Sequence, residues 1–458
     1  MLNTENISAR LCKWALIILV SVLIVLHFNM LIPGPDAGIF MYGGMLINKG
    51  YMPYKELWDN KPPLIYYIAS IGYLYKHQPF LLIRIIEIGF LLLNLFLIKK
   101  IVRLHYAQSA VYYQFLFILL YFLFWDRGFL TETFTIPINL FAVYLFYTKH
   151  KIRQPSLVVC WWLLFLLKPN AVVLASIIIF ADVLRGKKIT VSAISYILQF
   201  SIVAIVVYTW LSYTGMFDGF IQQVFTENIN HTQNRTLVFF LSHHFSQPKY
   251  IALWLLIIMA CITAYRDKEL RIISICLLLT YIAAFINGKN HGHYVLLAIV
   301  PATAIGGYAL TKSKWLIVAL LGVFLAAVHQ NTLSLRRYEK AQAQKSKLVE
   351  FVKAETNINQ RIYFAGKDNT YIYILTDRLS STRFLLPFAE TYKTDSPFGQ
   401  MLEKELISYK PFLLLVPKDS LCSQHHYASV INGMLLSYDS VNNIGDVNIY
   451  KLNPHKHH

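Results

Sequence analysis

Two acidic residues stand where long apolar stretches of this sequence meet polar loops. Asp36 directly follows the first apolar stretch, and Glu132 opens the fourth. A carboxylate at such a boundary can act as a general base toward a hydroxyl group. Lys61, Arg84 and Lys168 are expected on the same side of the apolar layer, where their charges could stabilise a phosphate. These residue types suit a reaction in which a hydroxyl loses a proton while an anion leaves.

Each of these residues also has a purely structural interpretation. Asp36 could cap the helix expected after it, and Glu132 could be favoured at a helix start by the helix dipole. Arg84 precedes Glu87 by three residues, so the two could pair within one helix. Lys168 could extend its long side chain to an interface. The residues alone leave these alternatives open.

The first polar loop holds the densest group of candidate residues. It begins with Gly34-Pro35-Asp36-Ala37 and closes with Pro53-Tyr54-Lys55-Glu56-Leu57-Trp58-Asp59-Asn60-Lys61-Pro62-Pro63. Between these ends the sequence predicts a helix from about Ala37 to Lys49-Gly50, because glycine is a common helix stop. Tyr54 and Asp59 are candidates for substrate contact beside Lys61.

A second polar group opens the tenth apolar stretch, with the sequence Asn287-Gly288-Lys289-Asn290-His291-Gly292-His293-Tyr294. We expect His291, His293 and Tyr294 to contact substrate. Two histidines at i,i+2 could also bind a divalent metal ion, but no partner carboxylate stands beside them. No cofactor is therefore assigned, and a divalent metal ion stays an open alternative.

The composition indicates a protein with many membrane spans. Of 458 residues, 56% are hydrophobic and only 14% charged, whereas about 25% is usual for soluble domains. The mean hydropathy is +0.47. Long apolar runs predict eleven transmembrane helices. They lie at about 12–32, 79–98, 108–125, 131–148, 156–167, 170–184, 190–212, 250–266, 270–287, 294–310 and 314–331.

The net charge of +18 does not indicate nucleic acid, because the basic residues form short clusters at the ends of the spans. With a cytoplasmic N-terminus, every cluster lies on the cytoplasmic side. This topology requires the segment 62–76 to lie at the outer interface as a short helix. It also requires Lys168-Pro169-Asn170 to divide one apolar stretch into two short helices. The five cysteines form no disulfide framework.

The tail changes composition abruptly and predicts a small α/β domain. A charged helix is expected over 334–353 and another helix over 401–409. Strands are expected over 361–364, 371–375, 412–416 and 447–452. The predicted fold class is thus an all-α polytopic membrane protein with a small C-terminal α/β domain. Residues 1–331 form the transmembrane domain, with loops at 33–78 and 212–249, and residues 332–458 form the extracytoplasmic domain.

With these residues in view, the first loop resembles that of the GT-C class of membrane glycosyltransferases. It is most similar to the bacterial branch of the protein O-mannosyltransferase and aminoarabinose-transferase superfamily. The resemblance rests on an acidic residue after the first helix, a Gly-x-x-Pro-Tyr turn at 50–54 and Trp-Asp-x-Lys-Pro-Pro at 58–63. It implies the GT-C fold and covers about half of the chain strongly.

The resemblance also implies roles for single positions. Asp36 matches the acidic residue that activates the acceptor or helps to bind a metal, and Lys61 matches a lysine near the donor phosphate. Glu132 matches the acidic residue of the second loop, with Asp126 as the alternative.

Two positions depart from the pattern of the family. Asp36 is followed by Ala37, where many relatives have a second carboxylate. Lys61 is preceded by Asn60, where aminoarabinose transferases carry Glu. These departures leave the metal and the sugar open.

The sequence therefore predicts an inverting glycosyltransferase of the bacterial inner membrane with its active site on the outer face. The expected partners are a polyprenyl-phosphate-linked sugar donor, a lipid, glycan or protein acceptor, and membrane lipids. Asp36 and Glu132 are the expected catalytic residues, and Lys61, Arg84 and Lys168 are expected to bind the donor phosphate. A polysaccharide polymerase or ligase and a lipid or sugar transporter remain as alternatives.

Overall fold

The computed structural model describes residues 4–29, 34–105, 110–125, 128–148, 150–186, 188–227, 250, 254, 258, 262, 268–285, 292–312, 320, 322, 345–366, 370–385, 397–418 and 425–456. The chain forms two compact units. Unit 1 comprises Met1–Leu31, Asn60–Ile65 and Leu81–Asn331, and unit 2 comprises Ile32–Asp59, Tyr66–Phe80 and Thr332–His458. Most of the first loop thus shares a compact unit with the tail.

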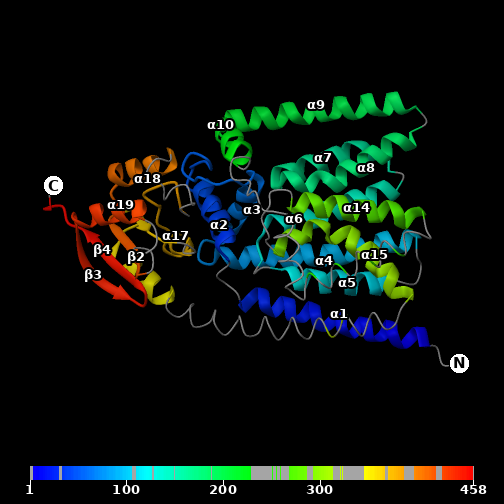
Figure 1. Ribbon diagram of the computed structural model, residues 1–458, viewed down its shortest axis with the longest axis horizontal. Helices are drawn as coiled ribbons and strands as arrows, with labels where there is room; N and C mark the ends of the chain where they lie inside the picture. Colours follow the sequence, from blue (N-terminus) through cyan, green and yellow to red (C-terminus); the bar gives the residue numbers. More distant parts are fainter. Residues whose placement is uncertain are drawn as a thin grey trace. The chain divides into compact units, whose positions relative to one another are not determined.

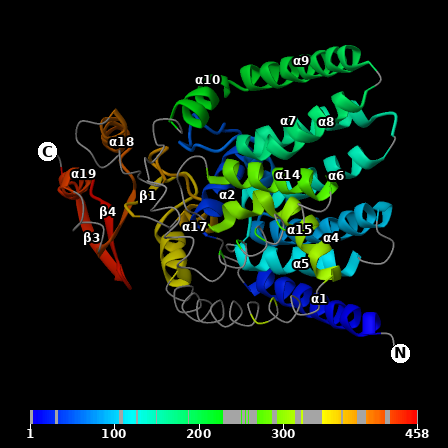
Figure 2. The same ribbon diagram turned by 45° about the vertical axis from the view of Figure 1, so that its right-hand side comes forward.

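Unit 1 is a bundle of apolar helices, which lie side by side in Figures 1 and 2. The described helices are α1 (Thr4–Asn29), α4 (Pro79–His105), α5 (Ala110–Phe124), α6 (Thr131–Tyr147), α7 (Arg153–Leu167), α8 (Val172–Arg185), α9 (Ile189–Tyr213), α10 (Phe217–Phe220), α14 (Lys268–Phe285) and α15 (Ile299–Lys312). Short 3-10 helices η2 (Pro169–Ala171) and η4 (Gly292–Ala298) precede α8 and α15, and the π-helix η3 (Ile221–Thr226) follows α10.

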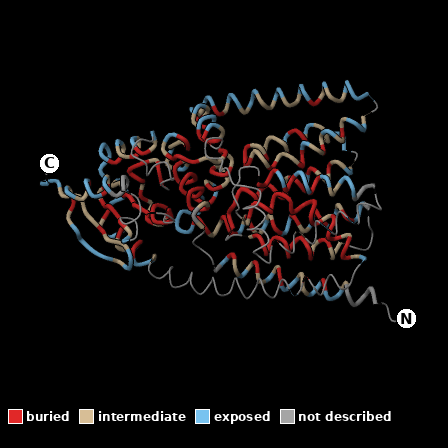
Figure 3. The backbone as a smooth tube through the Cα atoms, viewed as in Figure 1, coloured by how far each residue is buried: buried red, intermediate tan, exposed pale blue. Residues whose placement is uncertain are grey.

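The core of unit 1 is built around α5, whose residues are apolar on every face. Such a helix is stable only when other helices cover it on all sides. Helices α1 and α15 pack against it, and every residue from Phe115 to Phe124 is buried (Figure 3). Close approach of α15 uses Gly307, where a Cβ would collide with the ring of Tyr113.

Helix α9 differs from the rest of unit 1 because most of its apolar surface is uncovered. Only 6% of the residues in its most apolar stretch are buried, and Ile197, Ile202 and Ile205 are each more than 60% exposed. A contiguous apolar surface of this kind is rare on soluble proteins. It is the surface expected of a helix that faces lipid.

Four of the described helical segments are long and apolar enough to cross a membrane. They are Ala9–Phe28, Pro79–Leu104, Ile189–Tyr213 and Gly292–Lys312. The predicted total of eleven spans is not confirmed. Most residues of the predicted spans 250–266 and 314–331 lie outside the described residues, and several other helices are shorter than a full span.

Two local predictions for the first loop are confirmed. The loop begins with α2 (Pro35–Asn48), and the aromatic segment forms α3 (Leu64–Gly72) followed by the 3-10 helix η1 (Tyr73–Tyr75). The N-cap of α2 is Gly34, so the interpretation of Asp36 as the cap is wrong. Asp36 lies instead in the first turn, where the helix dipole favours its negative charge.

The tail contributes a four-stranded sheet to unit 2, in the order β1-β2-β4-β3. Its strands are β1 (Ile362–Phe364), β2 (Leu413–Pro417), β3 (Tyr438–Ile444) and β4 (Val447–Leu452), and only β1 and β2 pair in parallel. The described helices of the tail are residues 345–355, α17 (Tyr371–Thr376), α18 (Pro397–Ser408) and α19 (His425–Leu435). The predicted mixture of helices and strands is confirmed.

Two predictions for the tail are wrong. Residues 371–375 form helix α17 instead of a strand, because strand propensity depends strongly on context and this segment packs against α2. Strand β3 was not predicted, because Asp439, Asn442 and Asn443 are types that strands usually lack. Its position at the edge of the sheet, with several residues exposed, accommodates these polar side chains.

Candidate functional site

Four of the predicted site residues come together in unit 1. Glu132 lies in the first turn of α6, Lys168 follows the last residue of α7, and His293 and Tyr294 belong to η4. We call these four residues the Glu132 cluster. Lys168 Nζ forms an ion pair with Glu132 Oε1, and His293 Nε2 lies 3.9 Å from the same oxygen. All four are buried, with exposed fractions between 2% and 7%.

The charges of the Glu132 cluster are held by several contacts. Thr131 Oγ1 donates a hydrogen bond of 2.9 Å to Glu132 Oε2. Lys168 Nζ lies 3.8 Å from the centre of the Tyr294 ring, a favourable cation–π arrangement. Buried charges are tolerated only when they are paired and hydrogen-bonded. The cluster therefore fixes one carboxylate and one ammonium group in a site with little access to water.

Lys168 reaches this position because of the residue that follows it. A residue before proline is disfavoured in the helical conformation, and Lys168 has extended backbone angles of φ −163° and ψ 109°. The predicted break between two short helices is thus confirmed. With Lys168 buried against Glu132, the alternative that it extends to an interface is wrong.

Arg84 and Glu87 form a second buried ion pair in unit 1, as their i,i+3 spacing predicts. Arg84 Nη1 lies 2.6 Å from Glu87 Oε2, and the two residues are 1% and 0% exposed. Glu87 Oε1 also accepts a hydrogen bond from the backbone N–H of Phe129. Gly128 has a φ of +72°, and a Cβ there would collide with Arg84 Nη1. The pair therefore holds the loop that leads into α6 and Glu132.

We expect Gly128→Ala to destabilise unit 1 by about 1–3 kcal/mol. Alanine is strained at a positive φ, and its methyl group would displace the Arg84 guanidinium. Thermal unfolding of the detergent-solubilised protein measures the effect. Gly89→Ala is the matched control, because this glycine lies within α4 and a Cβ there meets nothing within 4 Å. Since alanine favours helix, Gly89→Ala should be neutral or stabilising; equal losses in both variants would contradict the explanation.

A third group of candidate residues lies in the first loop, within unit 2. Tyr66 Oη donates a hydrogen bond of 2.6 Å to Asp59 Oδ2, and the rings of Tyr54 and Tyr66 meet edge to face at 6.1 Å. All three residues are buried. Burial, followed by the charge of Asp59, raises the pKa of both tyrosines well above its usual range. Both hydroxyls therefore remain protonated and can donate hydrogen bonds.

Asp36 is half-buried and belongs electrostatically to the same group. Its charge also contributes to the raised pKa of Tyr66, after burial, the electrostatic interactions with Asp59 and Tyr54, and the hydrogen bond to Asp59. The two helices that carry Asp36 and Tyr66 approach closely at Gly44 of α2, where a Cβ would meet the backbone of Ala69 at 2.6 Å. Close packing of α2 on α3 thus brings Asp36 within electrostatic reach of Tyr66.

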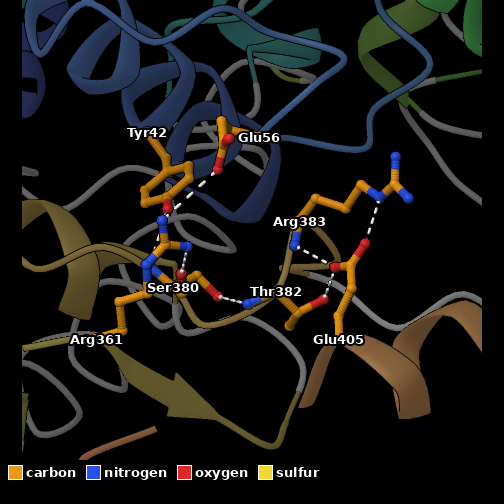
Figure 4. A network of polar contacts seen from close by, with 7 residues as sticks. All are labelled: Tyr42, Glu56, Arg361, Ser380, Thr382, Arg383 and Glu405. Atoms are coloured by element: carbon orange, nitrogen blue, oxygen red, sulfur yellow. Dashed lines mark hydrogen bonds and ion pairs between the residues drawn. The ribbon is translucent and has the colours of Figure 1, made fainter. Parts of the chain in front are cut away.

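The tail holds the first loop in place through a network of polar contacts (Figure 4). The backbone N–H of Ser380 donates a hydrogen bond of 2.9 Å to Tyr42 Oη in α2. Arg361 Nη1 donates to the carbonyl oxygen of Ser380 at 3.0 Å, and Arg361 Nη2 lies 3.9 Å from Glu56 Oε2. One arginine of the tail therefore joins the segment around Ser380 to the first loop.

The aromatic anchor of the loop is Trp58, next to Asp59. Its backbone N–H donates a hydrogen bond of 2.9 Å to the carbonyl oxygen of Arg383. Its ring packs against Phe384 and Phe398 at centroid distances of 5.6 and 5.1 Å. Arg383 is itself fixed by Glu405, whose carboxylate accepts from both Nε and the backbone N–H (Figure 4). The position of Asp59 thus depends on the tail.

The remaining candidates are placed as follows. Lys61 is half-buried, and its Nζ donates a hydrogen bond of 3.2 Å to Asn60 Oδ1. His291 and Asp126 lie outside the described residues. Among the residues that the structure describes, no three His, Cys, Asp or Glu side chains gather closely enough to hold a metal ion. The open alternative of a metal at the histidines therefore stays untested.

Several residues of these sites were not predicted as such. Tyr66 was expected only as part of the interfacial helix at 62–76, and its distance of seven residues from Asp59 gave no signal that the two are in contact. Arg383 and Glu405 carry no recognisable motif. Arg383 contacts Trp58, more than 300 residues away, and Glu405 acts on the first loop only through Arg383. For Glu87 the i,i+3 spacing was a sufficient signal for the ion pair, but not for the bond to Phe129.

The fold is similar to that of a solved enzyme structure over nearly the full chain. ArnT from Cupriavidus metallidurans in the apo state covers 95% of this chain and 97% of its own, with a TM-score of 0.65 and 13% identity. The same protein bound to undecaprenyl phosphate gives a TM-score of 0.64 and 14% identity, with the same coverage. The chain therefore has the GT-C glycosyltransferase fold that its first loop predicts.

Other comparisons add little. The Archaeoglobus fulgidus oligosaccharyltransferase tethered with an acceptor peptide shows a weaker similarity, with a TM-score of 0.48, 12% identity, and coverage of 93% of this chain and 72% of its own. No protein-family model matches this sequence, and no curated protein is similar to it by sequence.

Proposed function

We propose that this protein is an integral membrane glycosyltransferase that transfers a sugar from a polyprenyl-phosphate donor to an acceptor hydroxyl. The proposal is supported above all by the fold. This fold is similar, across 95% of the chain, to a structure that contains undecaprenyl phosphate. The buried, charged Glu132 cluster in a largely apolar bundle supports it further. Ionisable residues inside an apolar bundle are costly and typically functional.

The protein lies, in this proposal, in a bacterial inner membrane with its active site on the outer face. The exposed apolar surface of α9 supports the membrane location. The ends of α4 and α8 carry basic residues such as Lys99, Lys100 and Arg185, which favour the cytoplasmic side. The starts of α6 and η4, with Glu132 and His293, then face outward. The same reasoning puts the N-terminus inside and the tail outside.

In the proposed reaction the acceptor hydroxyl attacks the anomeric carbon of the sugar. Asp36 takes the proton of that hydroxyl while the new carbon–oxygen bond forms. The bond between the anomeric carbon and the phosphate oxygen breaks, and the phosphate leaves with the bonding electron pair. A single displacement of this kind inverts the anomeric configuration. Tyr66 and Asp59, which lie in the same group as Asp36, orient the acceptor or the sugar by hydrogen bonds.

The departing phosphate needs positive charge that is already in place. We assign this task to Lys61 and to Lys168. Within the Glu132 cluster, the carboxylate and the Tyr294 ring fix the ammonium group of Lys168, so little reorganisation is needed when the donor binds. His293, 3.9 Å from Glu132, is a further hydrogen-bonding group. Arg84 has a supporting role in this proposal, since its partner Glu87 also binds the backbone of Phe129 in the loop before α6.

Purified protein reconstituted with a radiolabelled polyprenyl-phosphate sugar tests the proposal. A panel of donors with different hexoses and pentoses, offered with lipid, glycan and peptide acceptors, should yield a glycosylated product with at least one pair. Movement of the donor across the vesicle membrane without any product would favour a transporter and contradict the proposal. Transfer only from lipid-diphosphate donors would favour a polysaccharide polymerase or ligase.

Loss of the charge at Lys61 should raise the KM for the donor. A hydrogen bond between charged groups contributes about 1.5–3 kcal/mol, so Lys61→Ala should raise the KM for the donor by roughly 10-fold to 100-fold. Lys61→Arg should recover part of the loss, because it keeps the charge. Lys55→Ala, an exposed lysine of the same loop, is the matched control and should leave the KM unchanged. Equal KM values for Lys61→Ala and Lys55→Ala would contradict the role of Lys61.

A further inference from the structure

Unit 1 contains an apolar cavity of 180 Å³ that the proposed transfer reaction does not use. It is lined by residues of α4, α5, α6, α8, α14 and α15, and most of its lining side chains are apolar. It is partly open, so a group from outside the bundle could enter it. An engineered cavity of about 150 Å³ with a similar lining stays dry and binds benzene. This cavity therefore suits a hydrocarbon group.

None of the four residues of the Glu132 cluster lines the cavity. In α6 its lining runs from Leu140 to Tyr147, whereas Glu132 is in the first turn of the same helix. With a rise of 1.5 Å per residue, these lining residues lie about 12 to 22 Å from Glu132 along α6. In α4 the lining residues, such as Ile101, likewise belong to the C-terminal half. The cavity therefore extends through the bundle toward the end at which Arg185 and Lys312 lie.

Two aromatic side chains that line the cavity each have a positively charged side chain above the ring. The guanidinium carbon of Arg185 lies 3.9 Å from the centre of the Phe146 ring, and Lys312 Nζ lies 5.6 Å from that of Tyr308. Both cations are exposed. Arg185 and Lys312 are the last residues of α8 and α15, four residues beyond the last lining residues of these helices, Ala181 and Tyr308.

From this arrangement we infer that the cavity binds an acyl chain of an anionic phospholipid from the surrounding bilayer, with its headgroup held by Arg185 and Lys312. A basic pocket between transmembrane helices on the cytoplasmic side is the kind of site that binds anionic headgroups. The inference requires the protein to lie in a membrane, as the proposed function does. It does not require the protein to transfer a sugar.

The neighbouring residues are compatible with an anionic headgroup. Asp182, which follows the lining residue Ala181, forms an ion pair of 2.8 Å with Arg153 and accepts a hydrogen bond from Tyr196. Its negative charge is thus already balanced. Thr303 lines the cavity, and its buried Oγ1 has no hydrogen-bond partner among the described residues. A bound lipid that carries an oxygen atom could supply one.

Native mass spectrometry of the delipidated protein measures the binding. The protein is incubated with phosphatidylglycerol and phosphatidylcholine of matched chains. With two cations near the headgroup, we expect about tenfold or greater preference for phosphatidylglycerol. The double variant Arg185→Gln/Lys312→Gln should lower this preference to near onefold. Lys100→Gln is the matched control, because Lys100 lies 5.5 Å from the Phe96 ring, which does not line the cavity. Its preference should equal that of the unchanged protein.

Filling the cavity with a larger side chain tests whether the acyl chain of the lipid inserts there. Ala304→Phe and the milder Ala181→Leu should each reduce the binding of both lipids at least severalfold, while thermal unfolding in detergent reports that the variants are folded. Equal binding of both lipids to the unchanged protein, or an unchanged preference in the double variant, would overturn the inference. So would displacement of phosphatidylglycerol by an equimolar polyprenyl phosphate. None of these measurements needs sugar transfer, so their failure is distinct from failure of the proposed enzyme.

Discussion

Replacing Asp36 with asparagine should reduce sugar transfer by about 10²-fold to 10⁴-fold, the usual contribution of a general base. Asparagine has nearly the same size as aspartate and retains a hydrogen-bonding oxygen, but it cannot take a proton at neutral pH. The loss should therefore appear in kcat, with little change in the KM for the donor. Initial rates at saturating donor, measured with reconstituted protein, separate the two parameters.

The comparison variant for this substitution is Asp218→Asn. Asp218 also lies in the first turn of a helix, α10, but it is exposed and outside the candidate sites. It should keep the full rate. Because Asp36 is only half-buried, Asp36→Asn should unfold at nearly the temperature of the unchanged protein. Full activity of a folded Asp36→Asn would remove Asp36 from the mechanism and leave the fold as the main support for the enzyme.

Breaking the buried pair of the Glu132 cluster should affect stability and activity together. Lys168→Met leaves the carboxylate of Glu132 buried without its cation, which typically costs about 3–5 kcal/mol. Glu132→Gln leaves Lys168 uncompensated, with a cost of the same order. The double variant Glu132→Gln/Lys168→Met removes both charges, so it should recover most of the stability. Unfolding by denaturant in detergent measures the free energy of unfolding of the unchanged protein, both single variants and the double variant, which together form a double-mutant cycle.

The double variant separates structure from chemistry. A pair with a purely structural role would allow transfer to return together with the fold. In the proposed mechanism the ammonium group of Lys168 stabilises the leaving phosphate, so the refolded double variant should stay inactive. Lys49→Met serves as the reference, because its partner Asp377 is about half-exposed and such pairs contribute about 0–1 kcal/mol. A Lys168→Met variant as stable as Lys49→Met would disprove the buried pair.

The arrangement of unit 2 gives the tail a defined task in the proposed enzyme. The first loop, with Asp59 and Tyr66, is joined to the tail through Trp58, Tyr42 and Glu56. Catalytic groups must be held within a fraction of an ångström by packing and hydrogen bonds around them. The tail is therefore better understood as the support of the first loop than as a separate binding module.

Much of the local structure could be predicted from short-range patterns. The helix after Asp36 follows from an apolar run that ends at a glycine, and the break at Lys168 follows from the proline after it. The pair Arg84–Glu87 follows from their spacing within one helix. Each of these features depends on residues a few positions apart. The strand expected at 371–375 failed because the packing of that segment, and not its propensity, decides its conformation.

The sequence by itself determined the apolar bundle, the GT-C-like first loop and the types of side chain available for chemistry. Only the tertiary structure decided that Glu132, Lys168, His293 and Tyr294 form one cluster, and that the tail supports the first loop. The reason is physical. Helix periodicity and caps act over a few residues, whereas a buried ion pair between α6 and α7 is formed only when whole helices pack and exclude water from both charges.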